Sequence, residues 1–390
     1  MYPPPLGAHI AGSIFYRDDL IQFGDLEFAR TSIQVLSNRG SSFIRQVPIG
    51  MPRIPPKMLD CVCYLYNSEE DAKKGKDFGG TAFLVAVPSP DPSQVFIYAV
   101  SNWHVACQGA SVLRVNTHDG GSDIIPYGPE DWSFDPRYDI AVRHFDYRRE
   151  IHRCSLLALE GLALQEHIEN QKIGPGDDVF MVGRFVDHDG GPINRPAVRF
   201  GNVSVMPSPI MQPNGQMADA YCIDLHSRSG YSGSPVFAYR TPGFDLEEPS
   251  PKSLETSKIL FAGTNYLACL GIHFSQFPEA WEFISGSAPA KEMSNVPLVA
   301  SGGYIKGLSG MTCVLPAWYI VEVLNMPSVK GPRDASIAVM QEKQRRAGQG
   351  MPSAESAIPI APEDANPRHK EDFTSLLNAA AKTKTPAGRT

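Results

Sequence analysis

Short apolar runs separated by polar and turn-forming residues dominate the chain from Met58 onward. Runs such as "GGTAFLVAVP" and "QVFIYAVSNWHV" are rich in β-branched and aromatic residues, and clusters of Asn, Asp, Gly and Pro stand between them. The same rhythm returns later in "DVFMVGRFVD", "AYCIDLHS", "SPVFAYR" and "YLACLGIHF". Many short strands with little helix between them predict an antiparallel barrel or sandwich, and two groups of them predict two β-lobes.

The pattern changes at both ends of the chain. Residues 1–57 are punctuated by Pro and Gly, which predicts an extended N-terminal arm with one short helix between 25 and 36. Residues 315–326 carry apolar side chains at helical spacing and predict a helix that closes the body. Residues 328–390 are polar, small and Pro-rich, which predicts a mostly disordered tail with a short amphipathic helix at 369–384.

The two groups of strands divide the body of the chain, residues 58–327, into two parts. The first lobe is expected at about 58–150 and the second at about 176–314. The intervening "CSLLALEGLALQEHIE" is the one strongly helical candidate within the body. Two polar or Gly/Ser-rich insertions are predicted to be surface loops, at 240–258 and 278–307.

Charge and cysteine content narrow the function classes. The 390 residues include 35 basic and 42 acidic side chains, a net charge of −7. This balance argues against nucleic acid or a membrane as the main partner, because both need a concentrated positive field. The first residues lack the features of a secretory signal, and no apolar run is long enough for a membrane helix. The seven cysteines form no metal-ligand pattern, so we expect free thiols in the cytoplasm, with no metal and no cofactor.

One loop, "GYSGSP", carries the features of an acyl-transfer site. Such a site needs an exposed hydroxyl, a base, and backbone N–H groups aimed at the developing oxyanion. Gly230 can adopt backbone angles that turn its N–H and that of Ser232 toward one point, and Gly233 allows close approach of a substrate chain. Ser232 is therefore the candidate nucleophile. Ser234 occupies the second glycine position of a Gly-x-Ser-x-Gly elbow and the loop leads into a strand, which excludes an α/β-hydrolase.

A serine nucleophile requires a base and an acid elsewhere in the chain. His104 lies at the end of an apolar strand, and Asp139 opens another. Taken singly, each residue has an ordinary structural explanation: a core histidine, a turn aspartate, a loop serine. Asp131 and Asp135 are weaker alternatives for the acid, because neither heads an apolar strand.

The motifs "NWHV", "DIAV" and "GYSGSPVF", in this order, resemble those of trypsin-like (chymotrypsin-fold) serine peptidases over about residues 58–327. The resemblance implies an all-β fold of two six-stranded antiparallel β-barrels with a C-terminal helix. It also implies that Ser232 attacks the scissile carbonyl, His104 is general base and then acid, and Asp139 orients the imidazole. Gly230 and Ser232 would supply the oxyanion N–H groups.

Two positions depart from the secreted members of that family. Tyr231 replaces the aspartate that pairs with a freshly cut N-terminus in secreted trypsins, which excludes activation by that salt bridge. Val105 follows His104 where those enzymes carry a disulfide cysteine. Both departures resemble bacterial and intracellular members such as glutamyl endopeptidases.

The specificity pocket is inferred from a second resemblance. "GIHF" is similar to the Gly-Ile-His strand of glutamyl endopeptidases and of viral cysteine peptidases of this fold, although Ser-Gln follows here in place of Gly-Gly. An imidazole and a hydroxyl suit a Glu or Gln side chain at P1 and suit a cation badly. The alternative, that the histidine only packs internally, stays open. The residues that the resemblance assigns to substrate are His226, at the pocket floor, with Ser227, His273, Phe274 and Ser275.

The sequence thus predicts a cytoplasmic serine endopeptidase of bacterial style that acts on a protein or peptide substrate. A different class is a peptide-binding or regulatory module on a peptidase fold with little turnover. In a third possibility, residues 1–57 or the helix at 369–384 occlude the cleft or dock onto a protein partner.

Overall fold

The computed structural model describes residues 13–14, 20–21, 54, 56–91, 94–188, 190–227, 229–240, 266–282 and 304–348. Residues up to Ile337 belong to one compact unit, which contains both β-lobes, and residues from Ala338 belong to a second unit. The strands of the described residues form two sheets, one for each lobe, which confirms the predicted all-β, two-lobe fold.

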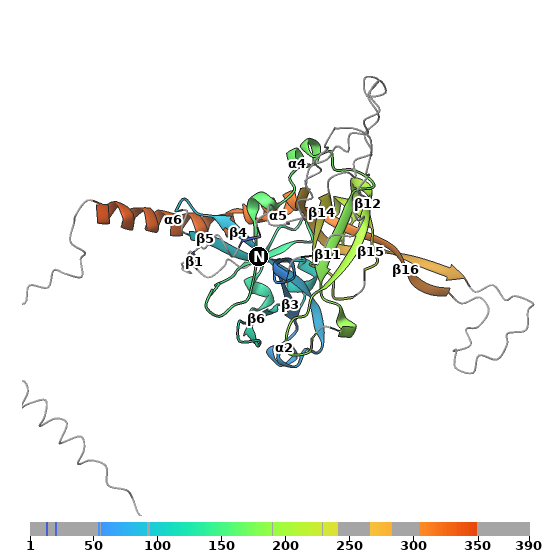
Figure 1. Ribbon diagram of the computed structural model, residues 1–390, viewed down its shortest axis with the longest axis horizontal. Coiled ribbons are helices and arrows are strands. Elements are labelled where there is room, and N and C mark those ends of the chain that lie inside the picture. The colour runs from blue at the N-terminus through green and yellow to red at the C-terminus, as the bar shows by residue number, and fades with distance from the viewer. Residues whose placement is uncertain are drawn as a thin grey trace, which may run out of the picture. The chain divides into compact units, whose positions relative to one another are not determined.

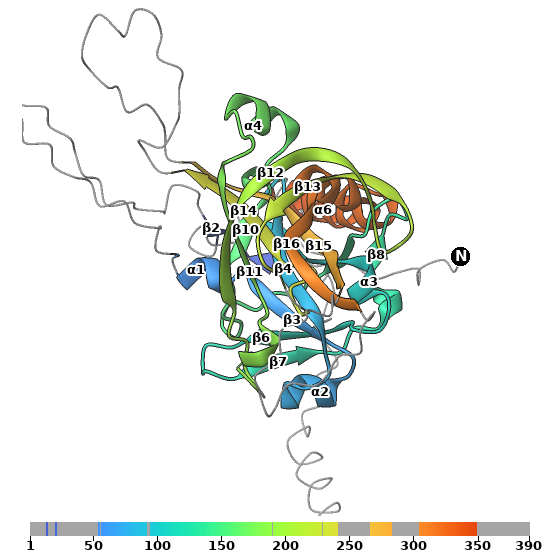
Figure 2. The ribbon, with the colours of Figure 1, turned by 90° about the vertical axis from the view of Figure 1, so that its right-hand side faces the viewer.

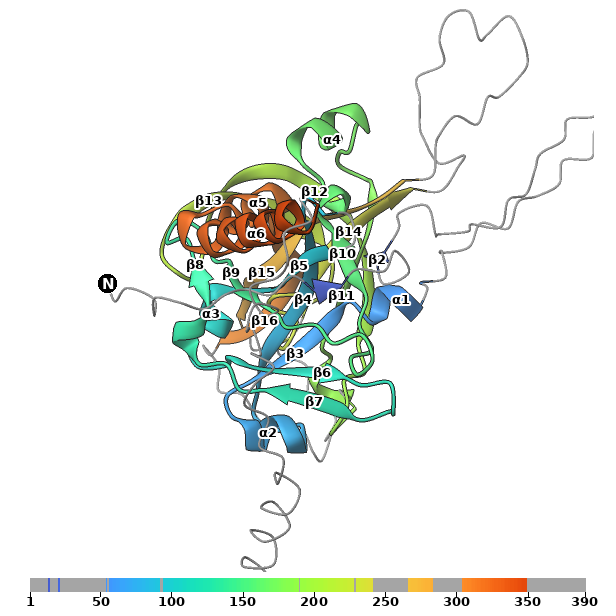
Figure 3. The same ribbon diagram turned by 90° about the vertical axis from the view of Figure 1, so that its left-hand side faces the viewer.

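The first lobe is built on an antiparallel sheet in the order β7-β6-β3-β4-β5-β9-β8. Figure 3 shows β6 and β7 beside β3 at one end of this sheet. The bounds of these strands are β3 (Val62–Tyr66), β4 (Phe78–Pro88), β5 (Gln94–Ser101), β6 (Val112–Asn116), β7 (Ser122–Ile125), β8 (Ser133–Phe134) and β9 (Ala141–His144).

Three short strands enlarge this first sheet. β1 (Ser13–Ile14) pairs with β5, and β2 (Leu20–Ile21) pairs in parallel with β10 (Leu156–Ala158), which also runs parallel to β4. Among the described residues the first sheet therefore has ten strands where six were expected, and they are not all antiparallel. Two of the additional strands come from the predicted N-terminal arm.

The helix predicted for "CSLLALEGLALQEHIE" is largely wrong. Its first part is strand β10, because the buried Leu156 and Leu157 add to the sheet edge. A 3₁₀ turn (Leu159–Gly161) follows, and only the last part forms α4 (Gln165–Asn170).

The second lobe is a closed six-stranded barrel in the order β11-β12-β13-β16-β15-β14, counted over the described residues. Figure 2 shows β12 and β13 curving side by side, as their antiparallel register requires. The bounds are β11 (Asp178–Gly183), β12 (Ala197–Met211), β13 (Met217–Asp224), β14 (Pro235–Arg240), β15 (Tyr266–Glu282) and β16 (Tyr304–Pro316).

Strands β15 and β16 continue together beyond the barrel as a long hairpin (Figure 1). Their pairing runs out to Glu282 and Tyr304, so both ends of the predicted loop at 278–307 are strand. The middle of that loop, and the other predicted loop beyond Arg240, lie outside the described residues.

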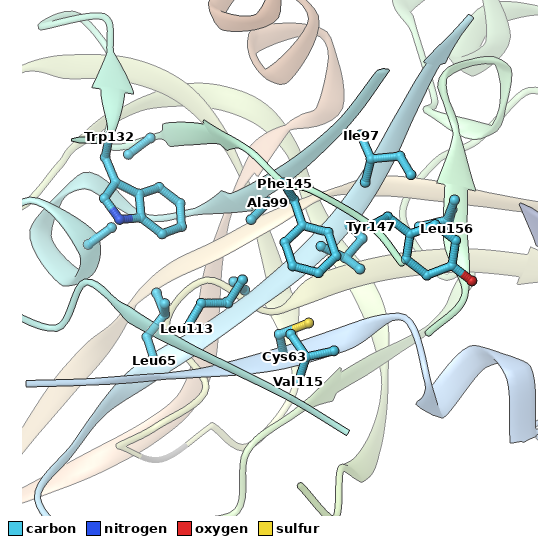
Figure 4. Packing of buried hydrophobic residues seen from close by; sticks show 14 of the residues in the cluster. Cys63, Leu65, Ile97, Ala99, Leu113, Val115, Trp132, Phe145, Tyr147 and Leu156 are labelled. Carbon is cyan, nitrogen blue, oxygen red and sulfur yellow. The ribbon is translucent and has the colours of Figure 1, made fainter. Parts of the chain in front are cut away.

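Each lobe encloses its own apolar core. In the first lobe, alternate residues of β3 (Cys63 and Leu65) point inward against Ile97 and Phe145, as Figure 4 shows. In the second lobe, residues such as Tyr231 and Leu270 fill the barrel. The period-2 alternation of the strands thus turns one face of each sheet into a core.

Helices are short in the described body apart from its C-terminal end. The predicted closing helix is present as α5 (Ala317–Leu324). α6 (Pro327–Gly348) corrects the prediction that a disordered tail begins at 328, and the buried Val329 and Arg333 give its first part a docking face. The predicted helices at 25–36 and 369–384 lie outside the described residues. The remaining helices are α1 (Pro56–Leu59), α2 (Glu69–Lys74) and α3 (Trp103–Ala106), with 3₁₀ turns at Pro129–Asp131 and Val186–His188.

Candidate active site

His104 and Asp139 meet at one edge of the first lobe. Strands β5 and β9 are antiparallel with Ser101 opposite Ala141, so the residues just after β5 and just before β9 lie together. His104 Nδ1 is 2.6 Å from Asp139 Oδ2, and the His104 N–H donates to Asp139 Oδ1 at 2.9 Å. The His104 side chain is 23% exposed and that of Asp139 is fully buried. The pair therefore joins a solvent-accessible imidazole to a shielded carboxylate.

The surroundings of Asp139 suit a buried charge. The two bonds from His104 go to its carboxylate oxygens. Asn102 Nδ2 donates to the main-chain carbonyl of Asp139 at 2.8 Å. A buried carboxylate is tolerated only when hydrogen bonds replace its hydration. Burial first, and the Asp139 charge second, raise the pKa of the nearby Cys107 thiol to about 12, so this cysteine is protonated at neutral pH.

The alternative acids are engaged elsewhere. Asp135 forms an ion pair with Arg137 at 2.8 Å. Asp131 accepts the Gly128 N–H at 2.8 Å and lies 3.8 Å from Arg143. Asp139 is thus the carboxylate that contacts His104.

Ser232 lies in the loop that joins β13 to β14 in the second lobe. Its glycine neighbours adopt left-handed conformations, with φ of +94° at Gly230 and +87° at Gly233. A Cβ at Gly233 would also collide with the Thr81 carbonyl oxygen. Ser232 itself is partly exposed, between buried residues. The loop thus presents one hydroxyl at the surface from a tightly packed backbone.

Thr81 on β4 connects this loop to the first lobe through hydrogen bonds. Its N–H donates to the Ser232 carbonyl at 2.8 Å and its Oγ1 donates to the Gly230 carbonyl at 2.7 Å. The role of Thr81 could not be predicted from the sequence, because "GGTAFLV" indicates only a strand. Its one signal is a hydroxyl at a fully buried strand position.

His104, the candidate base, and the loop of the candidate nucleophile at residues 230–234 (the nucleophile loop) approach each other at Gly80. An ideal Cβ at Gly80 would lie 2.7 Å from the Ser232 carbonyl oxygen and 2.9 Å from Cγ1 of Val105, the residue after His104. Among the described residues, no hydrogen bond joins His104 to Ser232. Such bonds are often long before substrate binds.

The Gly230 and Ser232 amides are available as donors. In the described part of the chain, neither donates to a backbone carbonyl, whereas the Gly233 and Ser234 amides are used by His273 and Tyr231. A positive φ at Gly230 is the conformation that only glycine adopts without strain. The arrangement suits an oxyanion site.

Tyr231 fills the position where an aspartate would have served activation. It is fully buried in the barrel core, and the Arg199 guanidinium lies 5.3 Å from its ring centroid. Burial raises the pKa of its phenol. The side chain is a packing element of the second lobe.

His273 lies next to the nucleophile loop because β14 and β15 are paired. Its N–H donates to the Ser234 carbonyl at 2.9 Å, and its carbonyl accepts from Gly233 at 3.0 Å. Its Nδ1 is 3.2 Å from the Tyr231 carbonyl oxygen, which can only accept, so Nδ1 carries the hydrogen. Burial lowers the pKa of His273 to about 3. Nε2 is therefore a lone-pair acceptor.

Ser227 and His273 each have one buried polar atom without a hydrogen bond in the described part of the chain, Oγ and Nε2 respectively. Both residues are 3% exposed. β16 pairs with both β13 and β15, with Thr312 bonded to the Leu225 carbonyl and Val314 opposite His273. No hydrogen bond joins the two side chains within the described residues.

The other predicted pocket residues differ in exposure. His226 is exposed, and its ring lies against Gly310 of β16. Phe274 is buried, and Ser275 is half-buried opposite Cys313. The structure thus brings His273 to the nucleophile loop, and the role of His226 stays a prediction.

The chain is similar in fold to several solved peptidase domains. It aligns with the MamO protease domain of Magnetospirillum magneticum at 14% identity and a TM-score of 0.39, over 69% of this chain and 98% of that one. It aligns with Deg5 at 20% identity and a TM-score of 0.32 over 46% and 75%, and with the inactive form of Rv3671c protease at 16% and 0.32 over 68% and 88%. No family model and no curated protein sequence matches the chain.

The described residues contain no cluster of His, Cys, Asp and Glu suited to a metal ion. None of their helices combines the length and the apolar character needed to cross a bilayer.

Proposed function

We propose that the protein is a serine endopeptidase that hydrolyses peptide bonds of a protein or peptide substrate. The observation that carries this proposal is the 2.6 Å contact between His104 Nδ1 and Asp139 Oδ2, with the Ser232 loop held to the same lobe. A buried carboxylate at that distance keeps the hydrogen on Nδ1, which leaves Nε2 to accept a proton.

The chemistry follows in two steps. His104 Nε2 takes the Ser232 proton as Oγ attacks the carbonyl carbon, and the Gly230 and Ser232 amides stabilise the oxyanion. His104 then returns the proton to the leaving amine, which leaves an acyl group on Ser232. Water, deprotonated by His104, hydrolyses that ester and restores the enzyme.

For the P1 side chain, the tautomer of His273 supports Gln over Glu. Nε2 is an acceptor, so its partner must be a donor, and a Gln amide has one whereas an ionised carboxylate has none. The Ser227 hydroxyl can donate to the amide oxygen. Without such a partner, Ser227 Oγ and His273 Nε2 are buried with no hydrogen bond, which is energetically unfavourable.

The compartment proposed for this peptidase is the cytoplasm. All seven cysteines are free thiols, which is the ordinary state of cysteine in a reducing environment.

The decisive experiment compares the protein with Ser232→Ala. A fluorophosphonate should label the unmodified protein at Ser232, and the variant should lose about 10⁶-fold in kcat on a peptide substrate. A folded variant that still cleaves at the original rate would contradict the mechanism. An unmodified protein that gives no burst with an activated ester, yet binds peptides, would support the alternative of a binding module.

The P1 proposal is tested with matched peptides that carry Gln, Glu, Lys or Leu before the cleaved bond. We expect the order Gln above Glu, with Lys and Leu far below. His273→Ala should remove the preference for Gln. Cleavage after Lys or Leu at comparable kcat/KM would overturn this assignment and leave the peptidase proposal intact.

A further inference from the structure

Gln212 lies at the tip of the β12–β13 hairpin of the second lobe. The sequence "QPNGQ" predicts a tight turn, with Pro at its second position and Gly in a left-handed conformation. The Gly215 N–H donates to the Gln212 carbonyl at 3.0 Å, and the Gln212 N–H donates to the Gln216 carbonyl at 2.9 Å. The turn therefore holds Gln212 in a defined place.

The Gln212 side chain points to the first lobe and ends on the segment that carries Asp139. Its Oε1 accepts the Asp139 N–H at 2.7 Å, and its Nε2 donates to the Arg137 carbonyl at 3.0 Å and the Gln216 carbonyl at 3.3 Å. An N–H can only donate and a carbonyl can only accept, so these partners fit one orientation of the amide. The residue is 3% exposed.

Asp139 is held at four points, and one of them comes from the other lobe. His104 binds both carboxylate oxygens and Asn102 binds the carbonyl, all within the first lobe. The fourth bond, to the backbone N–H, comes from Gln212. It fixes the main chain from which the carboxylate is directed.

The residues just before Asp139 are also anchored from the C-terminal side of the chain. The Tyr138 hydroxyl donates to Glu322 Oε2 of α5 at 2.8 Å, and the Tyr138 ring stacks on Tyr319 at 4.1 Å between centroids. The position of Asp139 therefore depends on elements outside the first sheet.

We propose that Gln212 is a positioning residue that aims the Asp139 carboxylate at His104 and so couples the second lobe to the base. The proposal rests on the proposed peptidase function. A 2.6 Å bond is directional, and a displacement of about 1 Å at a reacting group can cost on the order of 10²-fold in rate. Loss of the amide leaves the Asp139 N–H buried without this acceptor, and the segment must shift to satisfy it.

The kinetic test uses Gln212→Met, which keeps the length of the side chain and removes its hydrogen bonds. We expect kcat to fall roughly 10- to 100-fold while KM stays within about twofold, because substrate contacts are unaltered. The matched control is Asn214→Asp in the same turn. It keeps the acceptor for the Gln216 N–H and loses the 3.2 Å donation to Pro136, and its kcat should equal that of the unmodified protein.

The second readout does not depend on activity. The hydrogen between His104 Nδ1 and Asp139 should give a low-field proton resonance in protein with ¹⁵N-labelled histidine, assigned by its loss in Asp139→Asn. We expect the resonance to persist in Asn214→Asp and to move upfield or vanish in Gln212→Met. Should the Met variant fail to fold, Gln212→Asn retains the amide on a shorter side chain that cannot reach Asp139, and the same changes are expected.

An unchanged resonance and unchanged kcat in a folded Gln212 variant would overturn the positioning role. If the unmodified protein hydrolyses no peptide and the Gln212→Met variant loses the resonance, the peptidase proposal is overturned and the role of Gln212 stays intact. The two failures are therefore distinguishable.

Discussion

The nucleophile loop of the second lobe and the His104–Asp139 pair of the first lobe are each fastened by a polar side chain of the opposite lobe. Thr81 of β4 holds the loop, and Gln212 of the β12–β13 hairpin holds the acid. Each half of the candidate site therefore depends on the lobe that does not carry it.

The contacts made by Thr81 and by Gln212 differ in how rigidly each residue is itself held. Thr81 lies within a strand that is paired on both sides, and it uses its main chain as well as its hydroxyl. Gln212 stands at a hairpin tip and reaches Asp139 through its side chain alone. The first lobe thus holds the loop partly through its main chain, whereas the second lobe holds the acid through one side-chain amide. Changes to the acid's side of the site should alter rate more than stability, and changes at Thr81 should alter both.

Of the substitutions that test this comparison between the lobes, Asp139→Asn is expected to have the largest effect, because it breaks the first lobe's half of the site directly. An amide presents a donor where the carboxylate accepted from both His104 N–H groups, so it favours the wrong imidazole tautomer. We expect kcat to fall about 10⁴-fold, measured on a peptide substrate, with little change in KM.

Asp135→Asn is the matched control for that substitution. Its carboxylate pairs with the exposed Arg137 side chain and should be dispensable, with kcat within about twofold. If Asp135→Asn were as damaging as Asp139→Asn, the assignment of the acid would be wrong.

The strand pattern was sufficient to predict the two lobes, and the motif resemblance implied the pairing of His104 with Asp139. The contact agrees with the fold, because each residue borders an apolar strand and the two strands are neighbours. The apolar run at Leu156 and Leu157 was misread as helix, since a short buried run has no distinguishing period and only its pairing with β2 and β4 decides it.

The contacts that Thr81 and Gln212 make between the lobes could not be predicted from local sequence signals. Thr81 and Gln212 are separated along the chain from the groups they hold, and their residue types are common at strand and turn positions. What marks them is burial of a polar side chain, which exists only once both lobes are folded. His226 shows the same limit, because the resemblance assigns a position along the chain, whereas only the fold shows that its ring lies against Gly310 of β16.

A smaller effect is expected from Thr81→Val, which tests the contact between Thr81 and the nucleophile loop. Valine is close in shape but leaves the Gly230 carbonyl and the Arg184 N–H without the Thr81 hydroxyl that they now contact at 2.7 and 3.1 Å. We expect a loss of about 1–3 kcal/mol in the free energy of unfolding and roughly 10- to 100-fold in kcat. Urea unfolding and steady-state kinetics measure the two.

Thr81→Ser separates the hydroxyl from the methyl group. Serine keeps both hydrogen bonds and should retain most of the activity, with a loss of about 1 kcal/mol for the missing methyl. Equal activity losses in Val and Ser variants would mean that packing, and not the hydroxyl, holds the loop.

The effect that is smallest at neutral pH is the dependence of stability on pH, which tests whether His273 is a neutral acceptor. Burial lowers its pKa from 6.5 to about 3, so between those values the unfolded chain binds a proton that the folded chain does not. Stability therefore falls as the pH drops from about 6.5 toward 3, by up to about 1.4 kcal/mol per pH unit from this group.

His273→Gln should flatten the slope of stability against pH by that amount in urea unfolding series. Burial also lowers the pKa of His152, and that contribution is common to both proteins and cancels in the comparison. Ser227→Ala, which removes a neighbouring polar group that does not titrate, should leave the slope unchanged. An unchanged slope in His273→Gln would mean that His273 gains a proton in the folded state, and Nε2 would then be a donor suited to Glu at P1.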